Sequence, residues 1–264
     1  VWFGGTGDSH LQAAEKDLTL AYQSPNIHLL RDWAVDQAEK ANYRTVGIYA
    51  GPLGFAYNTE LLAKKKLTPP ACWSDLIKPE FRGEVQMANP HSSGTAFMAL
   101  ATLVQLSGEE KAFKYLKSLH RNIKLYPREG NTPLKNTSQG QNAISISFIH
   151  DVPGEVMAGF PIKGVMPCEG TGYEIGSMSI VKGARNIVNA KRFYDWALTA
   201  PAQDLAAQAK QFQLPANIRA TVDLRVPDIS KMKLIRYDFE KYGSPEERSR
   251  LLEKWEREVN NPPS

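Results

Sequence analysis

The chain has 264 residues, of which 42% are hydrophobic and 23% are charged, and its formal net charge is +4. A chain of this length is long for a single hydrophobic core and suits two lobes of moderate size. Its longest apolar run, residues 97–104, is much shorter than the roughly 20 residues that a membrane-spanning helix needs. The basic residues are scattered and form no ladder with aromatic residues, which argues against a nucleic-acid partner.

The first seven residues, VWFGGTG, predict a β-strand that runs into a glycine-rich turn. Asp8 can cap the helix that follows, and we expect this helix to run through Leu18. Because a strand is already under way at the first residue, we expect further residues upstream of the given chain.

The next segments predict alternating short strands and helices. Residues 45–49 and 55–57 have the pattern of two strands, and we expect Gly51-Pro52 to separate them. Ser107 and Glu110 have the spacing of a capping box, which predicts that a helix begins at Ser107. The alternation of strands and helices along the chain favours parallel α/β layers.

Residues 144–148 alternate apolar and hydroxyl side chains, which predicts a half-buried strand. The strand ends at His150 and Asp151, and a helix can start just after them. In open α/β sheets, ligands bind at such strand ends. The pair can therefore contact a ligand, or Asp151 can simply cap the helix. Both interpretations stay open on position alone.

Three segments place small, hydroxylated or glycine residues just before a predicted helix: Gly4–Gly7, Ser92–Thr95 and Gly130–Thr132. Helix N-termini offer free N–H groups and a partial positive charge, and hydroxyl groups add donors without bulk. Segments of this kind that converge can hold a phosphate without lysine or arginine. The alternative is that each segment is an ordinary N-terminal cap.

The sequence contains no Walker A loop, no G-x-S-x-G elbow and no H-E-x-x-H motif, and its five histidines lack metal-ligand spacing. We therefore predict no catalytic residue, no cofactor and no metal site. Glu174, between Gly172 and Gly176, can bind sugar hydroxyls together with His150 and Asp151, because each carboxylate oxygen accepts more than one hydrogen bond. Otherwise it is a carboxylate in a surface turn.

The chain has two cysteines, Cys72 and Cys168, which lack the C-x-x-C spacing of zinc and redox sites. They can form one disulfide in an oxidising compartment, but the sequence does not decide whether they pair.

The block Trp73–Gly83, WSDLIKPEFRG, resembles a signature of bacterial periplasmic solute-binding proteins of the ferric-binding-like group. Gly54–Leu62 is similar to the hinge strand that precedes this block in that family, and Ser92–Phe97 lies where family members place a helix start that touches the ligand. The resemblance covers nearly the whole chain.

This resemblance implies an α/β, two-lobed periplasmic binding protein fold (type 2) with hinge strands that close on a ligand. The first strand and helix of that fold are expected to be missing from the chain. One lobe would comprise residues 1–56 plus 174–264, and the other residues 57–173. The resemblance also implies a periplasmic location, no enzymatic activity and delivery of the ligand to an inner-membrane ABC permease. We expect a monomer.

The ligand is predicted from the positions at which this chain differs from the ferric-binding members of that family. Ferric-binding members coordinate iron through adjacent tyrosines after the strand equivalent to residues 144–148. This chain has His150-Asp151 there, and none of its ten tyrosines is adjacent to another. Because Fe(III) favours phenolate and carboxylate oxygens, iron is disfavoured.

The segment 168–176, with His150, Asp151 and Glu174, instead resembles the subgroup that binds hexose phosphates. These three side chains would then bind the sugar hydroxyls. Helix-start chemistry assigns the phosphate to five others: Thr6, Ser93, Thr95, Asn131 and Thr132. The predicted ligand is a hexose 6-phosphate such as glucose 6-phosphate.

Three other ligand or activity classes stay open. The first is ferric iron, held by Asp151, Glu174 and a synergistic anion. The second is an organophosphonate or a polyamine. The third is a hydrolase with Ser93 or Ser147 as the nucleophile and His150 as the base.

Overall fold

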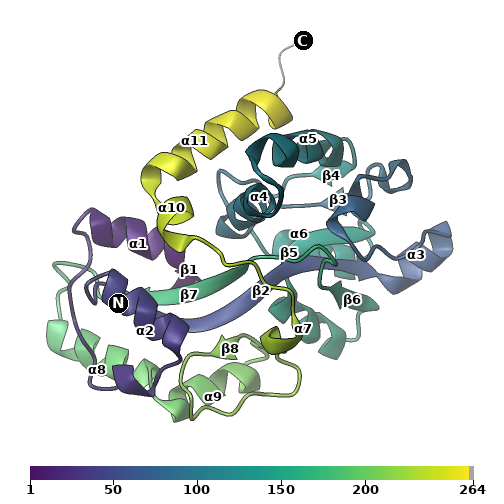
Figure 1. Ribbon diagram of the computed structural model, residues 1–264. Coiled ribbons are helices and arrows are strands. Elements are labelled where there is room, and N and C mark those ends of the chain that lie inside the picture. The colour runs from purple at the N-terminus through teal and green to yellow at the C-terminus, as the bar shows by residue number, and fades with distance from the viewer. Residues whose placement is uncertain (262–264) are drawn as a thin grey trace. The chain divides into compact units, whose positions relative to one another are not determined.

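The structure, a computed structural model, describes residues 1–261 of the chain. They form two compact units (Figure 1). Unit 1 comprises residues 1–51, 174–227 and 239–245, and unit 2 comprises residues 52–173 and 228–238 and the chain from Glu246 onward. Within residues 1–261, no helix has both the length and the apolar character needed to cross a membrane.

The units differ from the predicted lobes at residues 52–56 and at the C-terminal end of the chain, where residues 228–238 and 246–261 belong to unit 2. The Thr171 N–H donates to the Lys233 carbonyl at 3.0 Å, and the Ile235 N–H donates to the Thr171 carbonyl at 2.9 Å. Arg250 pairs with Glu109 at 2.6 Å. These contacts join residues more than 60 positions apart, so no local sequence pattern predicts them.

Unit 1 contains antiparallel pairs of β-strands. Strand β1 pairs with β7, with Thr6 opposite Gly176, and the first part of β2 pairs with β8. Its elements are β1 (Trp2–Thr6), α1 (Gly7–Glu15), α2 (Asp32–Lys40), the beginning of β2 (Val46–Asn58), β7 (Tyr173–Ser179), α8 (Ile187–Ala197), α9 (Ala200–Gln208), β8 (Leu214–Pro215) and α10 (Phe239–Gly243).

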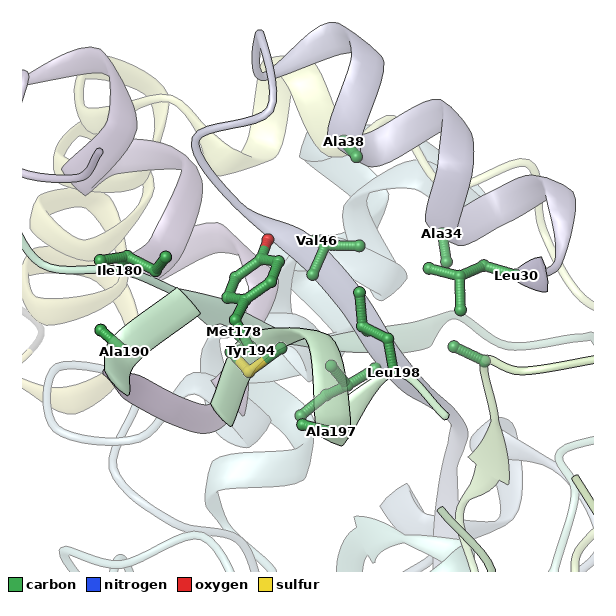
Figure 2. Close-up of a cluster of buried hydrophobic side chains, with 12 residues drawn as sticks. Leu30, Ala34, Ala38, Val46, Met178, Ile180, Ala190, Tyr194, Ala197 and Leu198 are labelled. Atoms are coloured by element: carbon green, nitrogen blue, oxygen red, sulfur yellow. The ribbon is translucent and has the colours of Figure 1, made fainter. Parts of the chain in front are cut away.

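The core of unit 1 is a cluster of buried side chains from α2, β2, β7 and α8 (Figure 2). Small residues on the inner faces of the helices, such as Ala34 on α2 and Ala190 on α8, let the helices approach the sheet closely. Met178 and Tyr194 fill the space between them and are almost fully buried. The cluster fixes β7, the strand that carries Glu174.

Unit 2 has a mixed sheet. The remainder of β2 pairs antiparallel with β5 and β6, whereas β3 pairs parallel with β4 and β5. Its elements are α3 (Thr59–Lys65), β3 (Val85–Gln86), α4 (Gly94–Ser107), α5 (Glu109–His120), β4 (Ile123–Leu125), α6 (Thr132–Ser138), β5 (Ile144–Phe148), α7 (Val152–Met157), β6 (Ile162–Val165) and α11 (Pro245–Trp255) with a π-helical turn over Glu256–Asn260. Helices α4 and α5 pack on each other (Figure 1).

Two predictions about the sheet were wrong. The strands do not form a parallel sheet, because β1, β2 and β7 take part in antiparallel pairs. Strand β5 is buried on both faces, and Ser145 and Ser147 are inaccessible to solvent. Both faces of β5 are covered because α4 and α6 pack against it.

Three boundary predictions were also wrong. Strand β2 continues through Gly51-Pro52. Strand β7 is a hydrogen-bonded neighbour of β2, which also pairs with β8 at residues 49–50 and with β5 and β6 from residue 53 onward. These partners keep the strand extended on either side of Gly51-Pro52. Asp8 lies in the first turn of α1, which is capped at Thr6 and ends at Glu15.

Ser107 ends α4 instead of capping the next helix. Its hydroxyl donates to the Leu103 carbonyl at 3.0 Å, and Gly108, with φ of +82°, separates α4 from α5. The sequence beyond Asn260 predicts a frayed tail, and residues 262–264 of it lie outside the described residues.

A disulfide joins Cys72 to Cys168, 96 residues apart. The Glu169 carboxylate accepts from the N–H groups of Trp73 and Ser74 at 2.8 and 2.9 Å, and the Trp73 indole N–H donates to the Gly170 carbonyl at 3.0 Å. The start of the Trp73–Gly83 block is thus anchored to the loop that leads to Glu174.

Loss of this disulfide should lower the free energy of unfolding by about 2–4 kcal/mol, because the bond closes a long loop in the unfolded chain. Urea unfolding of the native protein, the reduced protein and a Cys72→Ser/Cys168→Ser variant measures the effect. The chain has no other cysteine, so reductant can act on no other thiol pair. Equal unfolding midpoints for all three samples would contradict the prediction.

Candidate functional site

Two of the three predicted helix-start segments meet in unit 2. A Cβ atom built on Gly130 would lie 2.5 Å from the Thr95 Oγ1 atom and 2.9 Å from the Ser93 Oγ atom. The two hydroxyl groups therefore lie against the backbone at Gly130, and a Cβ atom at this position would force them to move. Ser93 also caps α4, accepting from the Ala96 N–H at 3.3 Å. We call Ser93, Thr95 and Gly130 the anion cradle.

The two loops that form the anion cradle are tied together by hydrogen bonds. The Asn89 N–H donates to the Pro127 carbonyl at 2.8 Å, and the Ser92 hydroxyl donates to the Arg128 carbonyl at 2.8 Å. The Ala96 N–H is taken by Ser93, so the N–H groups of Gly94 and Thr95 and the hydroxyls of Ser93 and Thr95 are the suitable donors to an anion.

Asn131 and Thr132 directly follow the anion cradle in the sequence. Asn131 is the N-cap residue directly before α6 and is exposed, and its side chain makes no capping hydrogen bond. Thr132 is partly buried at the first position of the helix. Their contact with an anion stays a prediction.

His150 and Asp151 lie in a 3-10 turn at the end of β5. The Nε2 atom of His150 is 3.6 Å from the Asp151 Oδ1 atom, and the His150 ring stacks on Phe148 at a centroid distance of 5.2 Å. Asp151 precedes α7 but its carboxylate makes no capping hydrogen bond. The capping interpretation of Asp151 was therefore wrong. Phe148 was not predicted as a site residue, although it lies two residues before His150 at the end of the extended segment.

Burial lowers the pKa of the His150 imidazole below its usual value of 6.5, and the neighbouring Asp151 carboxylate opposes the shift only in part. His150 is 3% exposed. At neutral pH its ring is uncharged, so one ring nitrogen donates a hydrogen bond and the other accepts one. Such a ring can accept a hydrogen bond from one sugar hydroxyl and donate one to the oxygen of another.

The lowered pKa of His150 predicts that acid destabilises the fold. The neutral ring is the favoured form in the folded state, so its contribution is complete above the unfolded pKa of 6.5 and is lost as pH falls through the lower folded pKa. Thermal unfolding between pH 7.5 and 5 should show this decline, and His150→Gln should reduce it. His10, whose pKa burial also lowers, should account for part of the remainder. An NMR titration midpoint of His150 at or above 6.5 would refute the assignment.

Unit 1 carries the other two predicted residues, Thr6 and Glu174. Thr6 precedes α1 but its side chain makes no capping hydrogen bond. Glu174 is 3% exposed within β7, so the interpretation as a surface-turn carboxylate was wrong. Thr6 lies opposite Gly176 in the β1–β7 pair, two residues beyond Glu174. A Cβ atom on Gly176 would lie 2.0 Å from the Tyr49 ring, so Tyr49 packs directly on this backbone.

The structure thus brings Ser93 and Thr95 together at Gly130, and places His150 beside Asp151. Another acidic group, Glu169, lies beside the two cysteine sulfurs. Those sulfurs are joined to each other and the Glu169 carboxylate accepts backbone hydrogen bonds, so these atoms serve the fold of unit 2.

The chain has two α/β units, and the long strand β2 passes from one to the other. Hydroxyl and carboxylate side chains lie at its helix starts and strand ends, and these features define the class of the bacterial periplasmic binding proteins. Residues 5–241 match the model of the bacterial extracellular solute-binding protein family, and the chain belongs to this family. It is a periplasmic or extracellular solute-binding protein, and the family binds solutes without catalysing a reaction.

Several relatives are similar over most of their length. The periplasmic binding protein AfuA from Actinobacillus pleuropneumoniae, solved with exogenous fructose-6-phosphate bound, is 46% identical with a TM-score of 0.96, over 99% of this chain and 82% of that one. The periplasmic binding protein P5PA is 40% identical with a TM-score of 0.93, over 98% and 82%. An uncharacterized protein of Haemophilus influenzae is 48% identical over 98% of this chain and 75% of its own length.

A ferric binding protein from Campylobacter jejuni shares the fold with a TM-score of 0.75, over 94% of this chain and 81% of that one, at 17% identity. These comparisons confirm the predicted family and the ferric-binding-like fold.

Proposed function

We propose that this protein is the substrate-binding component of an ABC importer and that its ligand is a hexose phosphate. The observation that carries the proposal is the anion cradle, where two hydroxyls at the start of α4 lie against the backbone of Gly130. The similarity to AfuA, which was solved with a hexose phosphate bound, supports the same ligand class.

The anion cradle suits a phosphate monoester. A phosphate carries several strong acceptor oxygens, and hydroxyl and N–H donors at the start of a 14-residue helix complement them and their charge. Neutral donors of this kind bind the anion without a competing salt bridge. In our proposal Ser93 and Thr95 bind the phosphate, and Thr6, Asn131 and Thr132 assist them.

The sugar is assigned to the remaining polar groups. Asp151 and Glu174 are acceptors for hydroxyl groups, and the neutral His150 ring contributes one donor and one acceptor. Phe148 fixes the plane of the His150 ring by stacking on it. Two carboxylates and a neutral ring suit a ligand with several hydroxyl groups better than they suit a phosphonate that carries no sugar.

Three parts of the expected function stay predictions: closure of two lobes around the ligand, a monomeric state and docking on an inner-membrane permease. Ferric iron is the alternative ligand, and the fold is shared with ferric binding proteins. Against iron stands the absence of any adjacent tyrosine pair in the sequence, since phenolate oxygens are ligands that Fe(III) favours.

A thermal-shift screen tests the proposal. It covers glucose 6-phosphate, fructose 6-phosphate, free hexoses, inorganic phosphate, an alkyl phosphonate and ferric citrate. We expect hexose phosphates to stabilise the protein by about 2.7 kcal/mol at 100 times their dissociation constant, and free hexoses to have little effect. Stabilisation by ferric citrate alone would refute the proposal and favour the iron alternative.

A further inference from the structure

The C-terminal helix contacts both loops that form the anion cradle. Trp255, the last residue of α11, is fully buried. Its ring meets the His91 ring at 5.8 Å and the Tyr126 ring at 5.4 Å, both edge to face. His91 lies two residues before Ser93, and Tyr126 lies four residues before Gly130. The Trp255 ring therefore contacts both loops, the one that leads to Ser93 and the one that leads to Gly130.

Neighbouring contacts fix the same two loops. The His91 Nε2 atom is 3.3 Å from the Glu256 carboxylate, which begins the π-helical turn directly after Trp255. The Tyr126 hydroxyl lies 2.9 Å from the His120 Nδ1 atom at the end of α5. On α4 itself, the Arg248 guanidinium lies 4.2 Å from the centre of the Phe97 ring, two residues after Thr95.

The C-terminal helix is in turn fastened to α5 by ion pairs. Arg250 pairs with Glu109 at 2.6 Å, and Lys117 pairs with Glu258 at 3.1 Å. These pairs are partly exposed, so each contributes little alone, but together they fix the register of α11 along α5. That register determines where the Trp255 ring lies.

The indole N–H of Trp255 is buried and has no hydrogen-bond acceptor among the described residues. A buried N–H without an acceptor destabilises a fold. The aromatic ring and its shape, and not a hydrogen bond, therefore hold the two loops. Phenylalanine can supply a ring at this position without the unsatisfied donor, whereas leucine cannot supply the flat face.

We propose that Trp255 is a positioning residue for the anion cradle: it holds the loop that begins α4 and the loop that carries Gly130 in the arrangement that binds phosphate. This inference rests on the proposed function for the identity of the ligand. Trp255 lies more than 100 residues away in the sequence from both loops, and it does not belong to the candidate site itself.

The test compares Trp255→Leu, Trp255→Phe and the control Leu62→Ala, which creates a cavity at a fully buried residue of α3 in the same unit. Isothermal titration with glucose 6-phosphate should give a dissociation constant roughly tenfold or more higher for Trp255→Leu, because binding depends on a preorganised cradle. Trp255→Phe should stay within about twofold of the native value, and Leu62→Ala should lower the melting temperature without changing affinity.

Hydrogen exchange without ligand gives the second readout. Trp255→Leu should speed exchange in residues 89–94 and 126–131, and Leu62→Ala should not. An unchanged affinity for folded Trp255→Leu, or an equal loss of affinity in Leu62→Ala, would overturn the positioning role. If the native protein binds no hexose phosphate while the exchange pattern holds, the ligand assignment fails and the positioning of the two loops stands.

Discussion

Alanine in place of Glu174 or Asp151 is expected to abolish the binding of hexose phosphates, with a loss of affinity of at least about 100-fold. Each carboxylate is proposed to accept hydrogen bonds from sugar hydroxyls, and bonds to charged groups contribute about 1.5–3 kcal/mol each. Glu174 is almost fully buried in β7, and Asp151 leaves the start of α7 uncapped.

Titration calorimetry with glucose 6-phosphate and with inorganic phosphate measures this prediction. The two variants should lose the first ligand and keep the native response to the second, because the anion cradle is unaltered. Glu60→Ala, which removes an exposed carboxylate from α3, is the control and should bind like the native protein. If both variants bind hexose phosphate with native affinity, the carboxylates do not recognise the sugar.

Asp151→Asn and Glu174→Gln separate charge from shape. The amides keep one acceptor oxygen and a similar volume, but they replace the second acceptor with donor hydrogens. An intermediate loss in these variants would show that both carboxylate oxygens accept hydrogen bonds. A loss as large as that of alanine would show that the negative charge is required.

Local sequence patterns were sufficient for much of the candidate site. The alternation at residues 144–148 located β5, and the pair His150-Asp151 lies at its end as predicted. The polar segment before residue 96 identified the start of α4, because an N-terminal cap depends on residues next to one another in the sequence. The Trp73–Gly83 block pointed to the family that the comparisons confirm.

Other features depend on contacts between distant residues, and no local pattern reveals them. Strand β2 continues through Gly51-Pro52 because it pairs with β5, β6, β7 and β8, which all come from far along the chain. The capping-box spacing at Ser107 was overridden because the apolar α4 extends to that residue, and Gly108 provides the break before α5. The burial of Glu174 could not be inferred from its glycine-flanked segment, which resembles an exposed turn.

The convergence of Ser93 and Thr95 on Gly130 is also a long-range feature, and it makes Gly130→Ala the most direct test of the anion cradle. The new methyl group would lie 2.5 Å from the Thr95 hydroxyl and 2.9 Å from the Ser93 hydroxyl. Both hydroxyls can rotate away about their Cα–Cβ bonds, so the fold should survive with a cost of about 1–3 kcal/mol. The rotated hydroxyls no longer point at the anion.

Gly130→Ala should therefore weaken hexose phosphate and inorganic phosphate alike, by roughly tenfold or more, since each lost hydrogen bond to a charged group contributes about 1.5–3 kcal/mol. This common loss distinguishes it from Glu174→Ala, which should affect the hexose phosphate only. Gly243→Ala is the matched control, because its methyl group would meet its nearest neighbour at an ordinary 3.7 Å. Native phosphate affinity in folded Gly130→Ala would place the anion elsewhere, since the methyl group cannot coexist with the present positions of both hydroxyls.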